Sequence, residues 1–190
     1  MKRRDALLAT LPILGWSSSL RAADDAIGAR LRAGRVAVLL RHSITDAGIG
    51  DPPGFRLDTC STQRNLSAEG RAQAQRIGAW FKARSLLPAR VRSSAWCRCI
   101  DTGTIAFGRA DAWESLNSFF GEANSRERQS AALGAALPGI VAGAFEVWVT
   151  HQVNITALTD EFAQMGEACV VERPTPGDLI RVVGRFSAGA

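Results

Sequence analysis

The chain has 190 residues, of which 46% are hydrophobic, and a formal net charge of +5 at pH 7. This length suits one domain, and the hydrophobic share is enough for a sizeable core. Positions 1–22 carry four basic residues and one acidic residue, so the rest of the chain has 19 basic and 17 acidic side chains, a charge of only +2. Composition therefore gives no reason to expect a nucleic-acid partner.

Residues 1–22 have the organisation of an export signal. The basic start Lys2-Arg3-Arg4 precedes an apolar stretch, 6–16, that is too short to span a bilayer as a stable helix, and Ala22 offers a small residue for cleavage. We therefore expect residues 23–190 to be the mature domain, located in the periplasm or cell envelope and without stable membrane insertion. The twin-arginine and the general secretory routes both stay open. The alternatives are an ordinary N-terminal helix or an uncleaved anchor.

Apolar strand-like runs alternate with helical patterns through the rest of the chain. The predicted strands lie at 35–41, 90–94, 144–150, 168–172 and 178–184, the last two as a hairpin. The predicted helices lie at 67–84, 95–107, 125–137 and from 151 to about 164, whereas 108–124 has an irregular pattern. This alternation predicts an α/β fold, a three-layer sandwich in which helices cover both faces of a mainly parallel central sheet.

Both histidines of the chain stand at the end of a predicted strand. His42 follows an apolar run and Arg41, and His151 follows the run 145–150. Ligands of open α/β sheets bind at the carboxyl ends of the strands, and a cation and an imidazole are costly to bury there unless they serve an anion. A single histidine at a strand end is more often structural, but the pair with its arginine indicates an anion site.

A third segment, Ser93-Ser94 followed by Arg98, has the same character of a strand end. Four motifs follow one another within residues 35–155. They are Leu40-Arg41-His42, Asn65 to Ala74 with its Leu66-Ser67-Ala68-Glu69-Gly70, Ser93-Ser94 with Arg98 and Thr102, and Thr150-His151. With these motifs the chain resembles the histidine phosphatase superfamily, which also contains the cofactor-dependent phosphoglycerate mutases.

The resemblance implies a role for each of four residues. His42 would attack the phosphorus and form a phosphohistidine. Arg41, Arg98 and His151 would hold the phosphoryl oxygens, which makes a metal unnecessary, so no metal or other cofactor is expected.

The general acid is less evident from the sequence. Ser118 stands where family members carry a glutamate. Glu122 is the nearest carboxylate and is taken as the candidate acid, with Glu114 in reserve. Some small members of the family manage without such an acid.

The loop 43–64 is long for a compact domain, and such loops often carry function. Ser43, where many family members have glycine, and Arg56 are taken as substrate-binding residues, the latter for the non-phosphate part of a substrate. A lid of structural turns is the alternative for this loop.

The four cysteines predict a disulfide in an oxidising compartment. Cys60 lies before the first predicted helix and is expected to pair with Cys97 or Cys99, whereas Cys169 is a buried thiol or a second partner. The cysteines lack the paired spacing of a metal site.

These features together predict an exported phosphatase that hydrolyses phosphomonoesters of small molecules or glycans. The signal, size and cysteines most resemble the periplasmic branch that includes the lipopolysaccharide core heptose phosphatases. Two alternatives stay open: a protein phosphohistidine phosphatase, and a non-catalytic phosphate- or glycan-binding protein that kept the pocket.

Overall fold

The computed structural model describes residues 26–120 and 123–188. The expected export signal, residues 1–22, lies outside the described residues, as does Glu122. Within the described part of the chain, no helix is long and apolar enough to cross a bilayer.

Six strands form one sheet in the order β3-β2-β4-β1-β5-β6. Their bounds are β1 Val36–Arg41, β2 Arg90–Ser93, β3 Asp111–Ala112, β4 Phe145–Thr150, β5 Ala168–Glu172 and β6 Arg181–Phe186. The pairs β1·β4, β2·β4 and β2·β3 are parallel, whereas β5 runs antiparallel to β1 and β6 antiparallel to β5. The predicted mainly parallel sheet with a terminal hairpin is confirmed.

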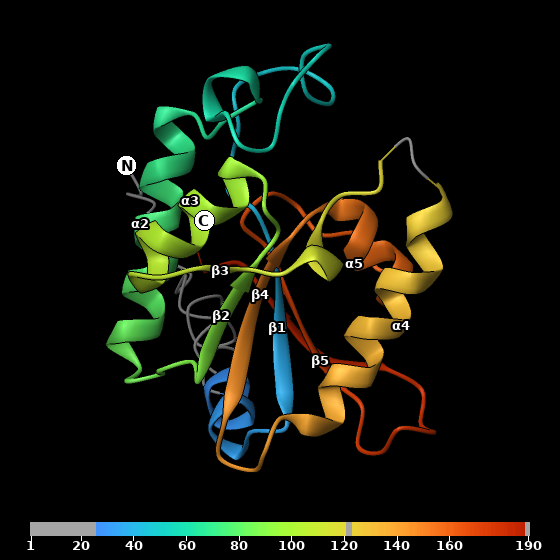
Figure 1. Ribbon diagram of the computed structural model, residues 1–190. Coiled ribbons are helices and arrows are strands. Elements are labelled where there is room, and N and C mark those ends of the chain that lie inside the picture. The colour runs from blue at the N-terminus through green and yellow to red at the C-terminus, as the bar shows by residue number, and fades with distance from the viewer. Residues whose placement is uncertain (1–25, 121–122, 189–190) are drawn as a thin grey trace, which may run out of the picture.

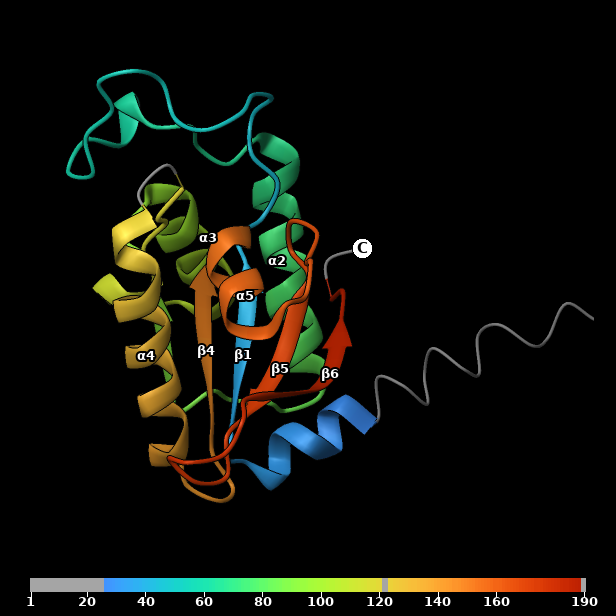
Figure 2. The same ribbon diagram turned by 90° about the vertical axis from the view of Figure 1, so that its right-hand side faces the viewer.

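Helices cover both faces of this sheet (Figures 1 and 2). Their bounds are α2 Ala68–Ala83, α3 Cys97–Phe107, α4 Arg126–Ala136 and α5 Gln152–Thr159, with short 3-10 turns η1 Cys60–Thr62, η2 Glu114–Leu116, η3 Ala123–Ser125 and η4 Leu137–Gly139. Alternate residues of β1 enter different cores: Val38 packs with α2 and α3, and Leu39 packs with α4 and α5. Both faces of β1 are therefore buried, as its continuous apolar run predicts.

The structure differs from the predicted elements in four places. The helix after β4 ends at Thr159 rather than near 164, because Asp160 adopts a left-handed conformation and caps it. The segment 108–124 contains the two-residue strand β3, and β6 begins only at Arg181. Residues 26–33 form a helix before β1 that was not predicted.

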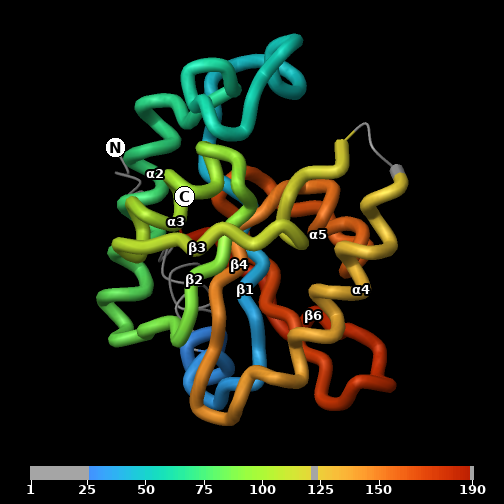
Figure 3. Tube along the Cα trace, in the orientation of Figure 1, coloured from blue at the N-terminus to red at the C-terminus, as the bar shows by residue number. Residues whose placement is uncertain are grey.

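The loop 43–64 lies beyond the carboxyl ends of β1 and β4, as the tube in Figure 3 shows. A disulfide between Cys60 and Cys97 ties it to the start of α3, which confirms the prediction that Cys60 pairs with Cys97 or Cys99. Cys99 and Cys169 are free and buried. The loop is thus anchored to the helix that carries Arg98.

Candidate active site

The parallel pairing of β1 and β4 brings the two histidines together. Arg41 is the register partner of Thr150, and the backbone N–H of His42 donates to the Thr150 carbonyl at 3.0 Å. The next residue on each strand is a histidine, and the two imidazole centres lie 5.5 Å apart. Only 3% of His42 and 5% of His151 is exposed. The strand ends therefore build a buried imidazole pair.

The contacts of His42 select its tautomer. Its Nδ1 lies 2.9 Å from the carbonyl oxygen of Ser43, which can only accept, so Nδ1 carries the proton and Nε2 keeps a free lone pair. Burial first, and the nearby Arg98, Arg41 and Arg64 in addition, lower the pKa of His42 to about 3 against the opposing effect of the Ser43 hydrogen bond. At neutral pH His42 is thus an uncharged imidazole with an available nitrogen, as a nucleophile requires.

The motif after the loop holds the backbone next to His42. The backbone N–H of Ser67 donates to the Ile44 carbonyl at 3.1 Å, and Gln73 Oε1 accepts from the Ile44 N–H at 3.0 Å. A Cβ on Gly70 would overlap the same Ile44 carbonyl, so this position of α2 requires glycine. The start of α2 therefore fixes the chain two residues after His42.

His151 is held by a series of hydrogen bonds that begins at Ser94, the residue after β2. Its Nε2 lies 2.8 Å from Ser94 Oγ, and the Ser94 hydroxyl donates to Asn117 Oδ1 at 3.3 Å, so Nε2 donates to Ser94. The other ring nitrogen, Nδ1, faces Arg98 Nη2 at 3.5 Å. Burial, followed by the proximity of His42 and Arg98, keeps the pKa of His151 well below its usual value. The second histidine is therefore also neutral in the free protein.

Three arginines surround the imidazole pair. Arg41 donates from Nη1 to the Ala163 carbonyl at 2.8 Å, Arg64 from Nη1 to Thr45 Oγ1 at 2.7 Å, and Arg98 from Nη1 to Asp51 Oδ1 at 2.8 Å. In all three the Nε is buried and has no hydrogen-bond partner. Burial and repulsion from Arg64 lower the pKa of Arg41, and burial and repulsion from Arg98 lower the pKa of Arg64. The cluster has more positive charge and more donors than the protein satisfies.

Arg64 is a member of this cluster that sequence reasoning missed. It ends the long loop, directly before Asn65, and nothing in its local sequence separates it from the many arginines on helix surfaces. Its position directly before the Asn65–Ala74 motif is the one signal in the sequence that could have indicated it.

Asp51, also unpredicted, is the carboxylate that pairs with the cluster among the described residues. Burial alone would raise the pKa of Asp51, but hydrogen bonds from the Arg98 side chain, the Arg64 backbone and Trp96 outweigh it and lower the pKa. Asp51 is therefore ionised and unsuited to donate a proton. Three arginines and one aspartate leave a local charge of +2, which matches a phosphoryl dianion.

The other predicted residues have different positions. Ser43 is buried, and it contributes its carbonyl to His42 while its own hydroxyl has no partner. The Arg56 side chain is 67% exposed and contacts Asp58 and Thr59 of its own loop, so the structure does not bring it to the histidines. Glu114 is also exposed and pairs with Arg128 of α4 at 3.3 Å. Glu122 lies outside the described residues.

Two exposed phenylalanines lie near the cluster. Phe55 of the loop packs on Trp96 at 5.9 Å between ring centres, and Trp96 packs on His151 at 5.3 Å. Phe162 lies 5.8 Å from the Arg41 guanidinium carbon. Both exposed phenylalanines therefore lie close to the cluster, Phe55 through Trp96 and Phe162 directly against Arg41.

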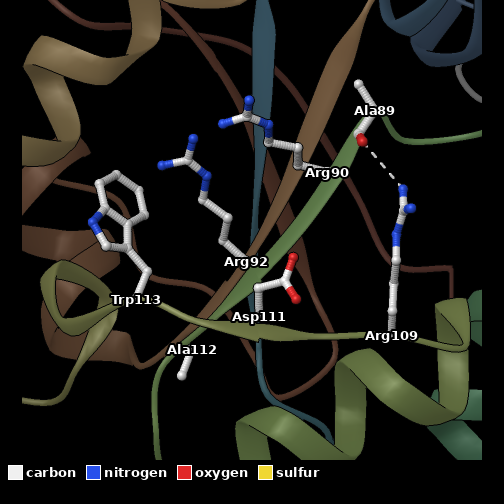
Figure 4. Close-up of a pocket in the computed structure, with 7 residues that line it drawn as sticks. All are labelled: Ala89, Arg90, Arg92, Arg109, Asp111, Ala112 and Trp113. Atoms are coloured by element: carbon white, nitrogen blue, oxygen red, sulfur yellow. Dashed lines mark hydrogen bonds between the residues drawn. The ribbon is translucent and has the colours of Figure 1, made fainter.

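A hollow on β2 and β3 contains none of the predicted site residues (Figure 4). Its arginines have protein partners: Arg92 Nε lies 3.1 Å from the Glu146 carboxylate, with its guanidinium 4.5 Å from the centre of the Trp113 ring. Arg109 donates to the Ala89 carbonyl at 3.1 Å. This hollow therefore lacks the unsatisfied donors of the imidazole site.

Comparison with known proteins shows a shared fold. No protein-family model matches the chain, and no curated protein matches it in sequence. The putative phosphohistidine phosphatase SixA from Agrobacterium tumefaciens is similar in structure over 80% of this chain and 97% of its own, with a TM-score of 0.53 and 19% identity. The structure of mycobacterial glucosyl-3-phosphoglycerate phosphatase in complex with inorganic phosphate is similar over 82% of this chain and 99% of its own. The TM-score is 0.58 and the sequence identity is 16%.

A phosphoserine phosphatase mutant from Entamoeba histolytica, in complex with phosphoserine, gives a TM-score of 0.55 at 12% identity, over 80% of this chain and 97% of that one. These solved structures are histidine phosphatases in fold. At such low identity they establish the architecture that the motifs predicted, and the chemistry rests on the side chains described above.

Proposed function

We propose that this protein is a phosphoric monoester hydrolase that works through a phosphohistidine on His42. The observation that carries the proposal is the combination of a neutral, tautomer-fixed imidazole with three arginines whose Nε groups are buried and unpaired. A binding site for a phosphoryl group needs the arginines, whereas the free Nε2 of His42 is needed only for transfer.

In the first step the Nε2 lone pair of His42 attacks the phosphorus while the bond to the leaving oxygen breaks. Arg41, Arg64 and Arg98 would bind the three equatorial oxygens, where charge is spread in the transition state. A bound dianion opposes the effect of the arginines on His151, so that ring can take up a proton and donate it to a phosphoryl oxygen. In the second step water attacks the phosphohistidine, releases inorganic phosphate and restores neutral His42.

The finer assignment is an exported phosphatase for a phosphorylated small molecule or glycan of the cell envelope, such as a phosphorylated sugar of the lipopolysaccharide core. Its support is the signal-like N-terminus, the disulfide and the exposed Phe55 and Phe162 beside the cluster. Rings of this kind offer apolar surface to the non-phosphate part of a substrate.

A protein phosphohistidine phosphatase is the second candidate. The carboxylate that contacts the cluster, Asp51, is held in its ionised form, and an imidazole leaving group needs less protonation than an alkoxide. The resemblance in fold to SixA agrees with this candidate. The non-catalytic binding protein is the third, and it predicts phosphate binding without turnover.

One experiment separates these candidates. Purified protein and its His42→Ala variant are assayed with a panel of phosphomonoesters, including phosphorylated sugars, and with a phosphohistidine peptide, each with and without EDTA. We expect EDTA-insensitive hydrolysis that disappears in the variant, and a phosphoryl label that is trapped on His42 in alkali. Activity that survives His42→Ala would overturn the proposed nucleophile, and labelling without turnover would favour the binding protein.

The general acid has its own test. If Glu122 protonates the leaving oxygen, Glu122→Gln slows alkyl phosphates by roughly 100- to 10,000-fold and slows p-nitrophenyl phosphate much less, because a good leaving group needs little protonation. Glu114→Gln is the matched control, since Glu114 pairs with Arg128 on the surface. Equal effects on both substrates would exclude the role, and substrate or water would then supply the proton.

A further inference from the structure

Asp51 is buried inside the loop that covers the strand ends. Its side chain is 8% exposed and accepts three hydrogen bonds: from Arg98 Nη1 at 2.8 Å, from the Arg64 backbone at 3.0 Å and from Trp96 Nε1 at 3.0 Å. A buried carboxylate is costly unless its charge is matched. Here the partner that matches it is a residue of the phosphoryl-binding cluster.

The loop does not need Asp51 for its attachment to the domain. The Cys60–Cys97 disulfide already joins it to α3, and Gln63 Oε1 accepts from the first N–H of α3, that of Cys97, at 2.9 Å. Thr45 pairs with Leu66 at the base of the loop. The buried charge of Asp51 is therefore not needed to attach the loop. This indicates that Asp51 serves Arg98, the arginine that it contacts.

Arg98 is the arginine that most needs orientation. It leaves the first turn of α3 on a long side chain, and its Nη2 has to point at the space beside His151, where it lies 3.5 Å from Nδ1. Asp51 holds the opposite nitrogen, Nη1, together with the Arg64 carbonyl at 3.4 Å. One side of the guanidinium is thus occupied, and Nη2 is directed toward the imidazoles.

We propose that Asp51 is a positioning residue, which fixes Arg98 so that its Nη2 meets a phosphoryl oxygen between His42 and His151. This inference rests on the proposed function and deepens it, because it assigns the loop a part in the reaction. Asp51 does not touch the reacting atoms; it acts through Arg98. Its negative charge also leaves the cluster at +2 rather than +3, in balance with a dianion.

A double-mutant cycle tests this role. Asp51→Asn, which keeps the shape and removes the charge, is compared with Arg98→Ala and with the double variant, using kcat/KM for p-nitrophenyl phosphate and the affinity for inorganic phosphate by calorimetry. We expect Asp51→Asn to lower kcat/KM roughly 10- to 100-fold when Arg98 is present, from the loss of a charged hydrogen bond, and less than about twofold when it is absent. Asp58→Asn, a charge removal at an 82% exposed site of the same loop, should have no effect.

An equal loss in both backgrounds would show that Asp51 only supports the loop, and no loss in either would also overturn the proposal. If Asp51→Asn does not fold, Asp51→Glu retains the charge one methylene further out, and its loss should likewise vanish without Arg98. If the protein hydrolyses no phosphomonoester, the proposed function fails. The phosphate affinities of the same four proteins then still decide whether Asp51 acts through Arg98.

Discussion

Two groups of three arginines in this protein show what separates a site from a salt-bridged surface. Arg90, Arg92 and Arg109 line the hollow on β2, where Glu146 and backbone carbonyls take up their donors. Arg41, Arg64 and Arg98 meet a single carboxylate and keep three buried Nε groups without a partner. Of the two groups, only the second has unsatisfied charge next to the imidazole pair, so residue type and number by themselves do not identify the site.

The largest effect is expected at His42, the proposed nucleophile. His42→Ala should reduce hydrolysis more than roughly 1,000-fold, because the arginines alone bind phosphate without accepting it. Steady-state kinetics with p-nitrophenyl phosphate measures the loss, and retained binding of inorganic phosphate serves as the control. If His42→Ala retained near wild-type turnover, the imidazole beside Arg41, Arg64 and Arg98 would not distinguish this group from Arg90, Arg92 and Arg109.

Arg41→Ala and Arg92→Ala are matched variants, because each removes one arginine from one of the two groups. Arg41→Ala should lower kcat/KM roughly 100- to 1,000-fold, because it removes a donor aimed at developing charge. Arg92→Ala should leave activity close to wild type but lower the free energy of unfolding by about 1–3 kcal/mol, since it leaves the Glu146 carboxylate buried without its nearest cation. Kinetics and urea unfolding of both variants check the pair, and a reversed pattern would contradict the assignment.

The disulfide lies beside the second group, because it ties the loop that holds Arg64 to the helix that carries Arg98, and it should contribute to stability. It closes a loop with a sequence separation of 37 residues. Cys60→Ser combined with Cys97→Ser should therefore lower the free energy of unfolding by about 3–4 kcal/mol on the chain-entropy account. Urea unfolding of the double variant measures this, and the unmodified protein unfolded with and without reductant is the control, because reductant opens the same disulfide without replacing a side chain.

The smallest effect concerns pH and the buried imidazole. The pKa of His42 is lowered to about 3 in the folded protein, below its value of about 6.5 in the unfolded chain. The unfolded state therefore binds a proton that the folded state does not, so the contribution of His42 to stability is complete above pH 6.5 and is lost as the pH falls toward 3. The limiting slope is roughly 1.4 kcal/mol per pH unit.

Urea unfolding between pH 7 and pH 4.5 tests this slope. In His42→Asn the free energy of unfolding should fall less steeply with falling pH, by roughly the 1.4 kcal/mol per pH unit that His42 contributes. The paired surface carboxylates contribute equally in both proteins. Parallel declines in the two proteins would show that His42 is not kept neutral by burial.

The sequence by itself determined the parts of this protein that depend on local pattern and topology. Apolar runs predict β1 and β4, and the carboxyl ends of parallel strands lie at one edge of a sheet, so Arg41, His42 and His151 were expected at that edge. That β1 and β4 are neighbours was decided by the fold. The pairing of Cys60 with the start of α3 followed from the same approximate geometry. Sequence left Cys97 and Cys99 both open, and only the orientation of the first turn of α3 chose Cys97.

Only the tertiary structure decided which side chains of the long loop enter the site. Asp51 reaches Arg98 across 47 residues, and Arg64 turns inward while Arg56 turns to solvent. No periodicity governs such a loop, because its conformation is set by the disulfide, by Gln63 and by contacts with α3 rather than by its own pattern. The position of the proposed nucleophile was therefore indicated by the sequence, whereas the charge balance around it required the packing of remote segments.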